Sequence, residues 1–217
     1  MPGSTVVDIG ANKGGYTYWL SKAVDRKGKV FAFEPQPHLA DYLKKSFAEG
    51  FNGNITVESI GLSSKCGTAR LIIPERGKSY SPGATLEADN CEGFHSFNVP
   101  TDTLDNYFAG KNSRPVRFIK CDVEGHELEV FKGGETLLKE DHPVILFECE
   151  SRHLSKNSIR DVFKYLLDLG YEGHFFFDKK LLPLSIFDEK VHHVWGAKLY
   201  ANNFLFMIPE HSNMGVR

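Results

Sequence analysis

The stretch Thr5-Val-Val-Asp-Ile-Gly-Ala-Asn-Lys-Gly-Gly15 decides the fold of this chain. A short apolar run ends at Ile9, glycines and an asparagine interrupt it, and a helical pattern follows at once. This order predicts a buried strand, a tight loop and the N-terminus of a helix. In an open α/β sheet, such a loop is where a nucleotide-like ligand lies, against free backbone N–H groups and the positive end of the helix.

The next apolar run, Lys29-Val-Phe-Ala-Phe-Glu34, ends in an acidic residue followed by Pro35. A carboxylate at the tip of the second strand is placed to accept hydrogen bonds from both ribose hydroxyls. The loop and the acid together predict a site for an adenosine-containing ligand.

The identity of that ligand follows from departures from the dinucleotide fingerprint G-x-G-x-x-G. Asn12 stands where the second glycine would let the backbone approach a pyrophosphate. Asp8 would repel a pyrophosphate but suits an ammonium group, which favours S-adenosylmethionine. A purely structural strand-to-helix turn explains the glycines but not an acid at both strand tips. The expected cofactor-binding residues are Asp8, Gly10, Ala11, Asn12, Gly14, Tyr16, Glu34, Pro35, Ser59, Ile60 and Asp122.

Bulk composition sets limits on the class of protein. The chain has 217 residues, enough for one domain with a substantial core, and 26 basic against 28 acidic residues give no electrostatic case for nucleic acid or an anionic membrane. The four cysteines show no zinc-ligand spacing, and neither a signal peptide nor a membrane span is visible. We therefore expect a cytoplasmic protein. One domain is predicted over residues 5–209, with 1–4 a cloning remnant or a cut point, so the chain is expected to be part of a longer protein.

Strand and helix patterns alternate along the chain, which predicts a mostly parallel seven-stranded sheet with helices on both faces and an antiparallel last strand. The strands are expected at 5–10, 29–34, 55–62, 117–123, 143–148, 171–177 and 204–208. The helices are expected at 15–24, 39–47 (ending near Gly50), 104–108, 127–139 (interrupted at Gly133-Gly134) and 158–169. Residues 64–100 interrupt this alternation of strands and helices. They contain strand patterns at 69–73 and 94–99 on either side of a polar stretch from Glu75 to Cys91. We interpret this segment as an insertion near the site of the acceptor.

Acidic residues gather where the predicted strands end. Because the chemistry of an open α/β sheet lies beyond the carboxyl ends of its strands, the expected catalytic residues are Lys120, Asp122, Glu124, His126 and Glu148. Lys120 shares one face of its strand with Asp122, and burying its charge requires an acidic partner, for which Asp8 and Glu148 are the candidates.

Methyl transfer to an alcohol needs a base or a metal ion near the oxygen, because an alcohol has a high pKa. Asp122, Glu148, His126 and His153 are the candidates for the base. A solvent-facing His126 at the start of a helix explains the sequence equally well, and Asp122 and Glu148 also suit a structural ion pair with Lys120. A divalent cation, Mg²⁺ or Mn²⁺, is the alternative, and the sequence does not identify its ligands.

Several stretches resemble class I S-adenosylmethionine-dependent methyltransferases and, more narrowly, the FkbM family. The matching segments are Val7-Asp-Ile-Gly-Ala-Asn-Lys-Gly14, Phe33-Glu-Pro35, Gly61-Leu-Ser63, Thr103-Leu-Asp105, Ile119-Lys-Cys-Asp-Val-Glu-Gly-His-Glu127, Pro143-Val-Ile-Leu-Phe-Glu148 and Asn203-Phe-Leu-Phe-Met-Ile-Pro209. The resemblance implies O-methylation of hydroxyls on sugars or macrolide-type metabolites. It also implies that Glu124 and Glu148 lie near the acceptor. The chain departs from the family at Gly61, where alanine is common, and in lacking the usual N-terminal helices.

Our first hypothesis is therefore an enzyme that O-methylates a sugar or glycan hydroxyl, as a module of a glycan-assembling protein. Tyr80, Phe94, His95 and Asn98 of the insertion suit stacking on a sugar ring. The alternatives are a macrolide or other small metabolite as the acceptor, and a domain that binds S-adenosylmethionine without turnover. Intact acids at every strand tip argue against the last.

Overall fold

The computed structural model describes residues 1–48, 53–74, 80–87 and 94–209. Its main sheet has the strand order β10-β9-β11-β8-β7-β1-β2-β3. The strands of this sheet are β1 (Thr5–Ile9), β2 (Lys29–Phe33), β3 (Ile55–Glu58), β7 (Val116–Cys121), β8 (Val144–Glu148), β9 (Glu172–Phe177), β10 (Lys180–Pro183) and β11 (Asn203–Met207). The five strands from β3 to β8 are paired in parallel, and β11 is antiparallel to both β8 and β9. The predicted fold class is confirmed, with eight strands in this sheet instead of seven.

The additional strand, β10, forms a hairpin with β9. The turn residues Asp178 and Lys179 have φ values of 47° and 60°, as a two-residue hairpin turn of the favoured type requires. The hairpin was not predicted, because Asp-Lys is not one of the dipeptides, such as Asn-Gly, that are typical of such a turn.

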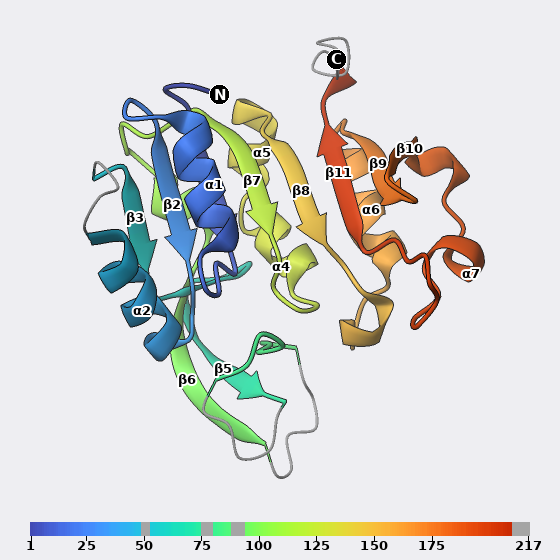
Figure 1. Cartoon of the computed structure of the whole chain (residues 1–217), viewed down its shortest axis with the longest axis horizontal. Helices are drawn as coiled ribbons and strands as arrows, with labels where there is room; N and C mark the ends of the chain where they lie inside the picture. Colours follow the sequence, from blue (N-terminus) through green and yellow to red (C-terminus); the bar gives the residue numbers. More distant parts are fainter. Residues whose placement is uncertain (49–52, 75–79, 88–93, 210–217) are drawn as a thin grey trace.

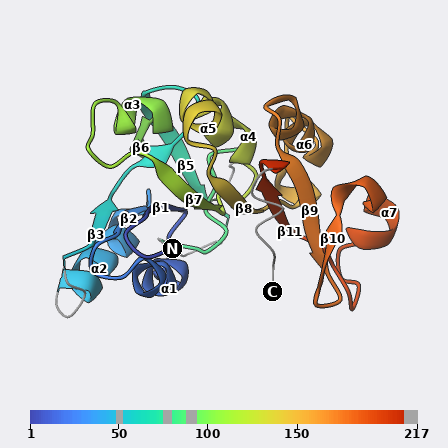
Figure 2. The same ribbon diagram turned by 90° about the horizontal axis from the view of Figure 1, so that it is seen from above.

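Helices cover both faces of the main sheet, as Figure 2 shows. The helices α1 (Gly15–Val24) and α2 (Pro37–Ala48) lie on one face, and α3 (Leu104–Phe108), α4 (Glu127–Lys132), α5 (Glu135–Asp141) and α6 (Ile159–Asp168) on the other. The short helix α7 (Glu189–His192) and the 3₁₀ turns η1 (Ser151–His153) and η2 (Leu184–Ile186) complete the described elements. The predicted break at Gly133-Gly134 separates α4 from α5. Glycine is needed at position 133 because a Cβ there would lie only 2.0 Å from the carbonyl oxygen of Ser63. The predicted helix end near Gly50 lies outside the described residues.

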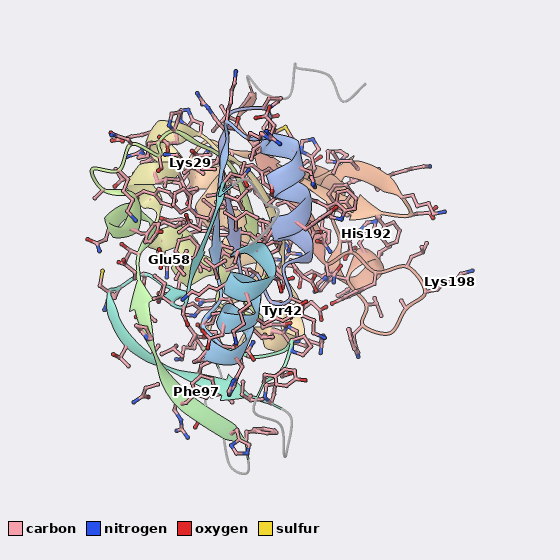
Figure 3. The ribbon with its side chains drawn as sticks, turned by 60° about the vertical axis from the view of Figure 1, so that its left-hand side comes forward. Lys29, Tyr42, Glu58, Phe97, His192 and Lys198 are labelled. Carbon is pink, nitrogen blue, oxygen red and sulfur yellow. The ribbon has the colours of Figure 1, made fainter. Side chains whose placement is uncertain are left out.

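The predicted strand over 55–62 is wrong in its second half. The chain leaves the main sheet after Glu58, and β4 (Gly61–Leu62) joins a separate sheet of order β4-β6-β5 with β5 (Gly67–Ile73) and β6 (His95–Asp102). Figure 1 shows β5 and β6 beyond the carboxyl ends of the parallel strands. In Figure 3, Phe97 of this small sheet lies beyond Glu58, the last residue of β3. About half of the described part of 64–100 therefore lies in this small sheet, which is placed over the edge where chemistry is expected.

A buried core supports the strands that end at this edge. All five residues of β1 are buried, and Phe147, Phe163 and Phe204 pack between the sheet and α6, with the rings of Phe163 and Phe204 4.7 Å apart. Burial of such side chains contributes about 1.5–3 kcal/mol each to folding. Within the described part of the chain, no helix is long and apolar enough to cross a membrane.

Candidate active site

The loop after β1 lies against the ends of both neighbouring strands. The backbone N–H groups of Gly10 and Ala11 donate to the carbonyl oxygen of Phe33, each at 3.0 Å, and that of Asp122 donates to Ile9 at 3.0 Å. A Cβ at Gly10 would lie 1.9 Å from the carbonyl oxygen of Asp122, and Gly10 has φ 76°. Glycine is therefore required here both by the left-handed backbone and by the close approach of β7.

Glu34 fastens this loop to the tip of β2. Its Oε2 accepts a hydrogen bond from the backbone N–H of Asn12 at 2.8 Å, and its Oε1 accepts one from Gln36 at 2.9 Å. Burial raises the pKa of the Glu34 carboxyl above its ordinary value, against the opposing effect of these two hydrogen bonds. A hydrogen bond from the Gln36 side chain also lowers the pKa of Glu34. Because a carboxylate has about four lone-pair sites, Glu34 can still accept a hydrogen bond from a ligand.

A cavity opens beyond this edge, with an empty volume of about 710 Å³ that includes its open mouth. The site residues predicted from the sequence that line it are Gly10, Asn12, Glu34, Pro35, Ile60, Asp122, Glu124 and His126. The predicted residues outside its lining are Asp8, Ala11, Gly14, Tyr16, Ser59, Lys120 and Glu148. The rest of the wall is apolar apart from Gln36 and includes Leu62, Leu71 and Leu86. Its position beyond the carboxyl ends of the parallel strands is where open α/β sheets bind their ligands, and it combines an apolar wall with a few polar groups.

Asp8 is placed behind the loop and not in the cavity. Its carboxylate is 2% exposed and accepts a hydrogen bond from the hydroxyl of Thr17 on α1 at 2.5 Å. Burial raises the pKa of Asp8 to about 6. This arrangement gives Asp8 a role in holding α1 against β1, and direct contact with a cofactor ammonium group stays a prediction from the sequence.

Lys120 is buried in the central strand β7 and is 1% exposed. Its Nζ lies 3.4 Å from Oδ2 of Asp122 and 5.0 Å from the ring centre of Tyr16. Asp8 and Glu148 were the first candidates for its partner, and the observed ion pair is with Asp122, which the sequence analysis gave as the structural alternative. The charge of Lys120 also acts on Asp8 and Glu148, because it opposes the rise in the pKa of each carboxyl group.

His126 is buried, which excludes the solvent-facing alternative. Its Nδ1 lies 2.6 Å from Oε1 of Glu87, and its Nε2 lies 2.9 Å from the hydroxyl of Ser63. The hydrogen bond from His126 holds the pKa of Glu87 below its ordinary value. With both ring nitrogens engaged, His126 is better placed to join the insertion to α4 than to remove a proton.

Glu148, at the end of β8, accepts a hydrogen bond from Nδ2 of Asn202 at 2.9 Å. Burial and, next, the charge of Asp122 raise the pKa of Glu148 to about 7. Burial is also the largest cause of the raised pKa of Asp122. These acids thus share one electrostatic environment, although Glu148 lines neither the first cavity nor the one beside it.

A second cavity lies beside the first and shares Pro82 and Glu124 with it as lining residues. Its other polar lining comes from the insertion and from the chain after β8, namely Ser81, Thr85, Glu87, Arg152, His153 and Ser155. Nδ1 of His153 lies 2.6 Å from Oε2 of Glu124. The described part of the insertion therefore contributes to both cavities. Tyr80, Phe94, His95 and Asn98 line neither, and much of the stretch from Glu75 to Cys91 lies outside the described residues.

Several site residues had no clear sequence signal. Gln36 holds the insertion over the first cavity, because its amide accepts from the N–H of Ser81 at 2.9 Å and donates to the Ser81 carbonyl oxygen at 3.1 Å. Its position two residues after Glu34 was the only clue. Glu87 and Arg152 reach the second cavity only because the small sheet and η1 fold back over the strand ends, and local pattern does not reveal this.

Among the residues that the structure describes, no group of three or more His, Cys, Asp or Glu side chains is arranged to hold a metal ion. Three cysteines are described, Cys66, Cys121 and Cys149, and all three are free thiols.

Comparison with known proteins gives one consistent result. The Methyltransferase FkbM domain family matches residues 8–172. The hexuronic acid methyltransferase AglP from Haloferax volcanii is 30% identical over 139 residues, which cover 64% of this chain and 53% of that protein. The methyltransferase sdnD from Sordaria araneosa is 27% identical over 195 residues, which cover 77% of this chain and 73% of that protein.

Among solved structures, the Methyltransferase FkbM from Methylobacillus flagellatus KT superimposes with a TM-score of 0.60 at 19% identity, covering 95% of this chain and 44% of that one. The present chain thus spans about half the length of that protein and of the H. volcanii relative. The family match covers most of the chain, and the sheet and its strand-end cavity agree with it. The chain therefore belongs to the FkbM methyltransferase family and has the class I S-adenosylmethionine-dependent methyltransferase fold.

Proposed function

We propose that the protein is an S-adenosylmethionine-dependent O-methyltransferase that acts on a sugar or glycan hydroxyl. The observation that carries this proposal is the pair of adjoining cavities at the carboxyl edge of the sheet, one bordered by Gly10 and Glu34 and the other lined by polar side chains. Membership of the FkbM family supports methyl transfer from S-adenosylmethionine.

The residues of the first cavity fit S-adenosylmethionine. Glu34 can still accept a hydrogen bond from the ribose, and Ile60, Leu71 and Leu86 supply an apolar wall for the adenine. Gly10 lets the loop after β1 lie close to the end of β7, which brings Asp122 to the same cavity. When bound, the cofactor supplies an electrophilic methyl group on a sulfonium, so the protein needs mainly to position the acceptor and remove its proton.

The second cavity supports a polar acceptor. Hydroxyl, carboxylate, guanidinium and imidazole groups line it, and a sugar forms hydrogen bonds with such groups more readily than a macrolide does. The name of the hexuronic acid methyltransferase also supports a sugar acceptor. A uronic acid offers both hydroxyls and a carboxylate oxygen, and the assay below distinguishes the two.

The test is methyl transfer from labelled S-adenosylmethionine to neutral oligosaccharides, uronic-acid oligosaccharides and a macrolide panel, with and without EDTA. We expect transfer to an oligosaccharide hydroxyl as an alkali-stable methyl ether. An alkali-labile product would be a methyl ester on a carboxylate, and transfer to macrolides alone would identify a small-metabolite enzyme. Binding of S-adenosylhomocysteine without transfer to any acceptor would favour the alternative of a binding domain without catalytic activity. Loss of turnover in EDTA would show that a divalent cation takes part.

Glu34→Gln tests the cofactor half separately. The amide has one acceptor oxygen for two backbone N–H donors and carries no charge, so we expect at least tenfold weaker binding of S-adenosylhomocysteine by calorimetry. Glu58→Gln is the matched control, since Glu58 ends the neighbouring strand but accepts its hydrogen bond from Tyr107 (2.8 Å) and does not line the cavity. Equal affinity in the Glu34 and Glu58 variants would contradict the assigned role.

A further inference from the structure

Glu124 lies where the two cavities meet, and it contacts His153 of the second cavity. The surrounding backbone brings these two residues together. Glu124 lines both cavities and has φ 53°, a left-handed conformation that is uncommon for a residue with a side chain. A Cβ at Gly125 would lie 2.3 Å from the carbonyl oxygen of His153, so glycine is needed for η1 to approach this loop. The hydroxyl of Thr85 donates to the carbonyl oxygen of Glu124 at 2.7 Å. Three segments thus converge on one carboxylate–imidazole pair.

We propose that His153 is the general base that removes the proton of the acceptor hydroxyl, with Glu124 as the residue that orients it. Nδ1 of His153 lies 2.6 Å from Oε2 of Glu124, so in the neutral ring Nδ1 carries the hydrogen and donates it to the carboxylate. Nε2 then has its lone pair available, and no described residue forms a hydrogen bond with it. This inference rests on the proposed function, because it requires a hydroxyl acceptor in the second cavity.

The other candidates for the base are less well placed. Both ring nitrogens of His126 are engaged, Asp122 is paired with Lys120, and Glu148 lines neither cavity. His153 combines a cavity-lining position, an orienting carboxylate and an available nitrogen.

The proton and electron balance of the step is simple. The proton of the acceptor hydroxyl moves to Nε2 of His153, and an oxygen lone pair forms the new bond to the methyl carbon. The electron pair of the broken carbon–sulfur bond stays on sulfur, which becomes a neutral thioether. The imidazolium is stabilised by Glu124 until it loses the proton to water.

The electrostatic surroundings agree with this role. The hydrogen bond to Glu124 raises the pKa of His153 above 6.5, and its charge acts in the same direction. The other charged groups around the ring are Asp122 after β7, Glu150 and Arg152 beside it in the chain, and Glu87 across the second cavity. Since the base must be neutral to accept a proton, turnover is expected to rise with pH through the pKa of His153.

The decisive variant is His153→Asn, whose amide NH₂ replaces Nδ1 as the donor to Glu124 but offers no base at the position of Nε2. We expect turnover with a hydroxyl acceptor to fall by about 100-fold or more, the usual range for a lost general base, with unchanged affinity for S-adenosylhomocysteine. His142→Asn is the matched control, because His142 lies in the exposed turn before β8 at the opposite edge of the sheet and has φ 50°, which asparagine tolerates. Turnover within twofold of the wild type in the His153 variant would overturn the proposal.

A readout independent of turnover is the NMR titration of His153 in the ligand-free protein. We expect a pKa above 6.5 that falls in Glu124→Gln, with the acidic limb of the pH–rate profile moving to lower pH in the same variant. A titration of His153 that Glu124→Gln does not change would overturn the dyad, even if the asparagine variant failed to fold. Wild-type protein that methylates no hydroxyl acceptor would refute the proposed function, whereas normal wild-type turnover with an active His153→Asn variant would refute only the assignment of the base.

Discussion

At the scale of single residues, Gly10 is the described glycine at which an added Cβ would come closest to another backbone atom. A Cβ there would lie 1.9 Å from the carbonyl oxygen of Asp122. We expect Gly10→Ala to separate the loop after β1 from the end of β7, lower the stability by about 1–3 kcal/mol and weaken binding of S-adenosylhomocysteine at least tenfold. Thermal unfolding and calorimetry measure the two effects.

The control for this variant is Gly53→Ala. Gly53 also has positive φ, at 67°, but a Cβ there would meet nothing within 4 Å. It therefore carries the conformational cost of a left-handed alanine without the clash. Equal losses in both variants would show that close approach to Asp122 is not what Gly10 provides.

At the residue scale, local pattern in the sequence indicates which residues lie at the strand-end cavity, whereas their contact with the cofactor stays a prediction. Gly10, Asn12 and Glu34 were predicted because a glycine-containing strand-to-helix turn and an acid at the next strand tip are local features, and all three line the cavity. Asp8 was expected in the same place. The sequence does not show that Thr17 of α1 holds its carboxylate on the opposite side of the loop.

At the scale of elements, Glu127 begins α4 and ties this helix to the loop before it. Its Oε1 accepts from the backbone N–H of Gly125 at 3.1 Å, and burial raises the pKa of Glu127 to about 7. The folded state therefore holds this proton more tightly than the unfolded state, whose pKa is about 4.5. The free energy of unfolding must therefore fall as the pH rises from about 4.5 to 7. Glu127 accounts for about 3 kcal/mol of this fall.

We expect Glu127→Gln to flatten that part of the stability–pH curve, because glutamine does not titrate. Denaturant unfolding at intervals between pH 4.5 and pH 8 measures the slope. Glu135→Gln is the matched control, since Glu135 is the first residue of α5 but is exposed to solvent. An unchanged slope in the Glu127 variant would contradict the role given to its burial.

Element boundaries could be predicted where both faces of an element are buried. The strand β1 was predicted within one residue because its β-branched residues stand directly before the glycine-containing loop, and all five of its residues are buried. The division of 55–62 between two sheets could not be predicted, since β4 leaves the main sheet to pair with β6, which lies some forty residues later. The hairpin of β9 and β10 was missed for the related reason that its turn carries no characteristic residues.

At the scale of the whole molecule, ligand binding is expected to join the main sheet to the small one. The first cavity is lined by strand ends of the main sheet, at Gly10 and Glu34, and by the insertion at Pro82 and Leu86. We therefore expect S-adenosylhomocysteine to slow amide hydrogen exchange in residues 9–12, 34–36, 82–86 and 122–126. The distant hairpin of β9 and β10 serves as the internal control and should exchange at the same rate with and without ligand. Protection confined to β9 and β10, or absent from 82–86, would contradict this placement.

The most direct test of the whole account is a crystal structure of the protein with S-adenosylhomocysteine. We predict that the ligand lies in the cavity beyond β1 and β2, with both ribose hydroxyls within hydrogen-bonding distance of the Glu34 carboxylate and its sulfur directed toward the cavity lined by Glu124 and His153. A ligand bound elsewhere, or a ribose that does not contact Glu34, would contradict the account.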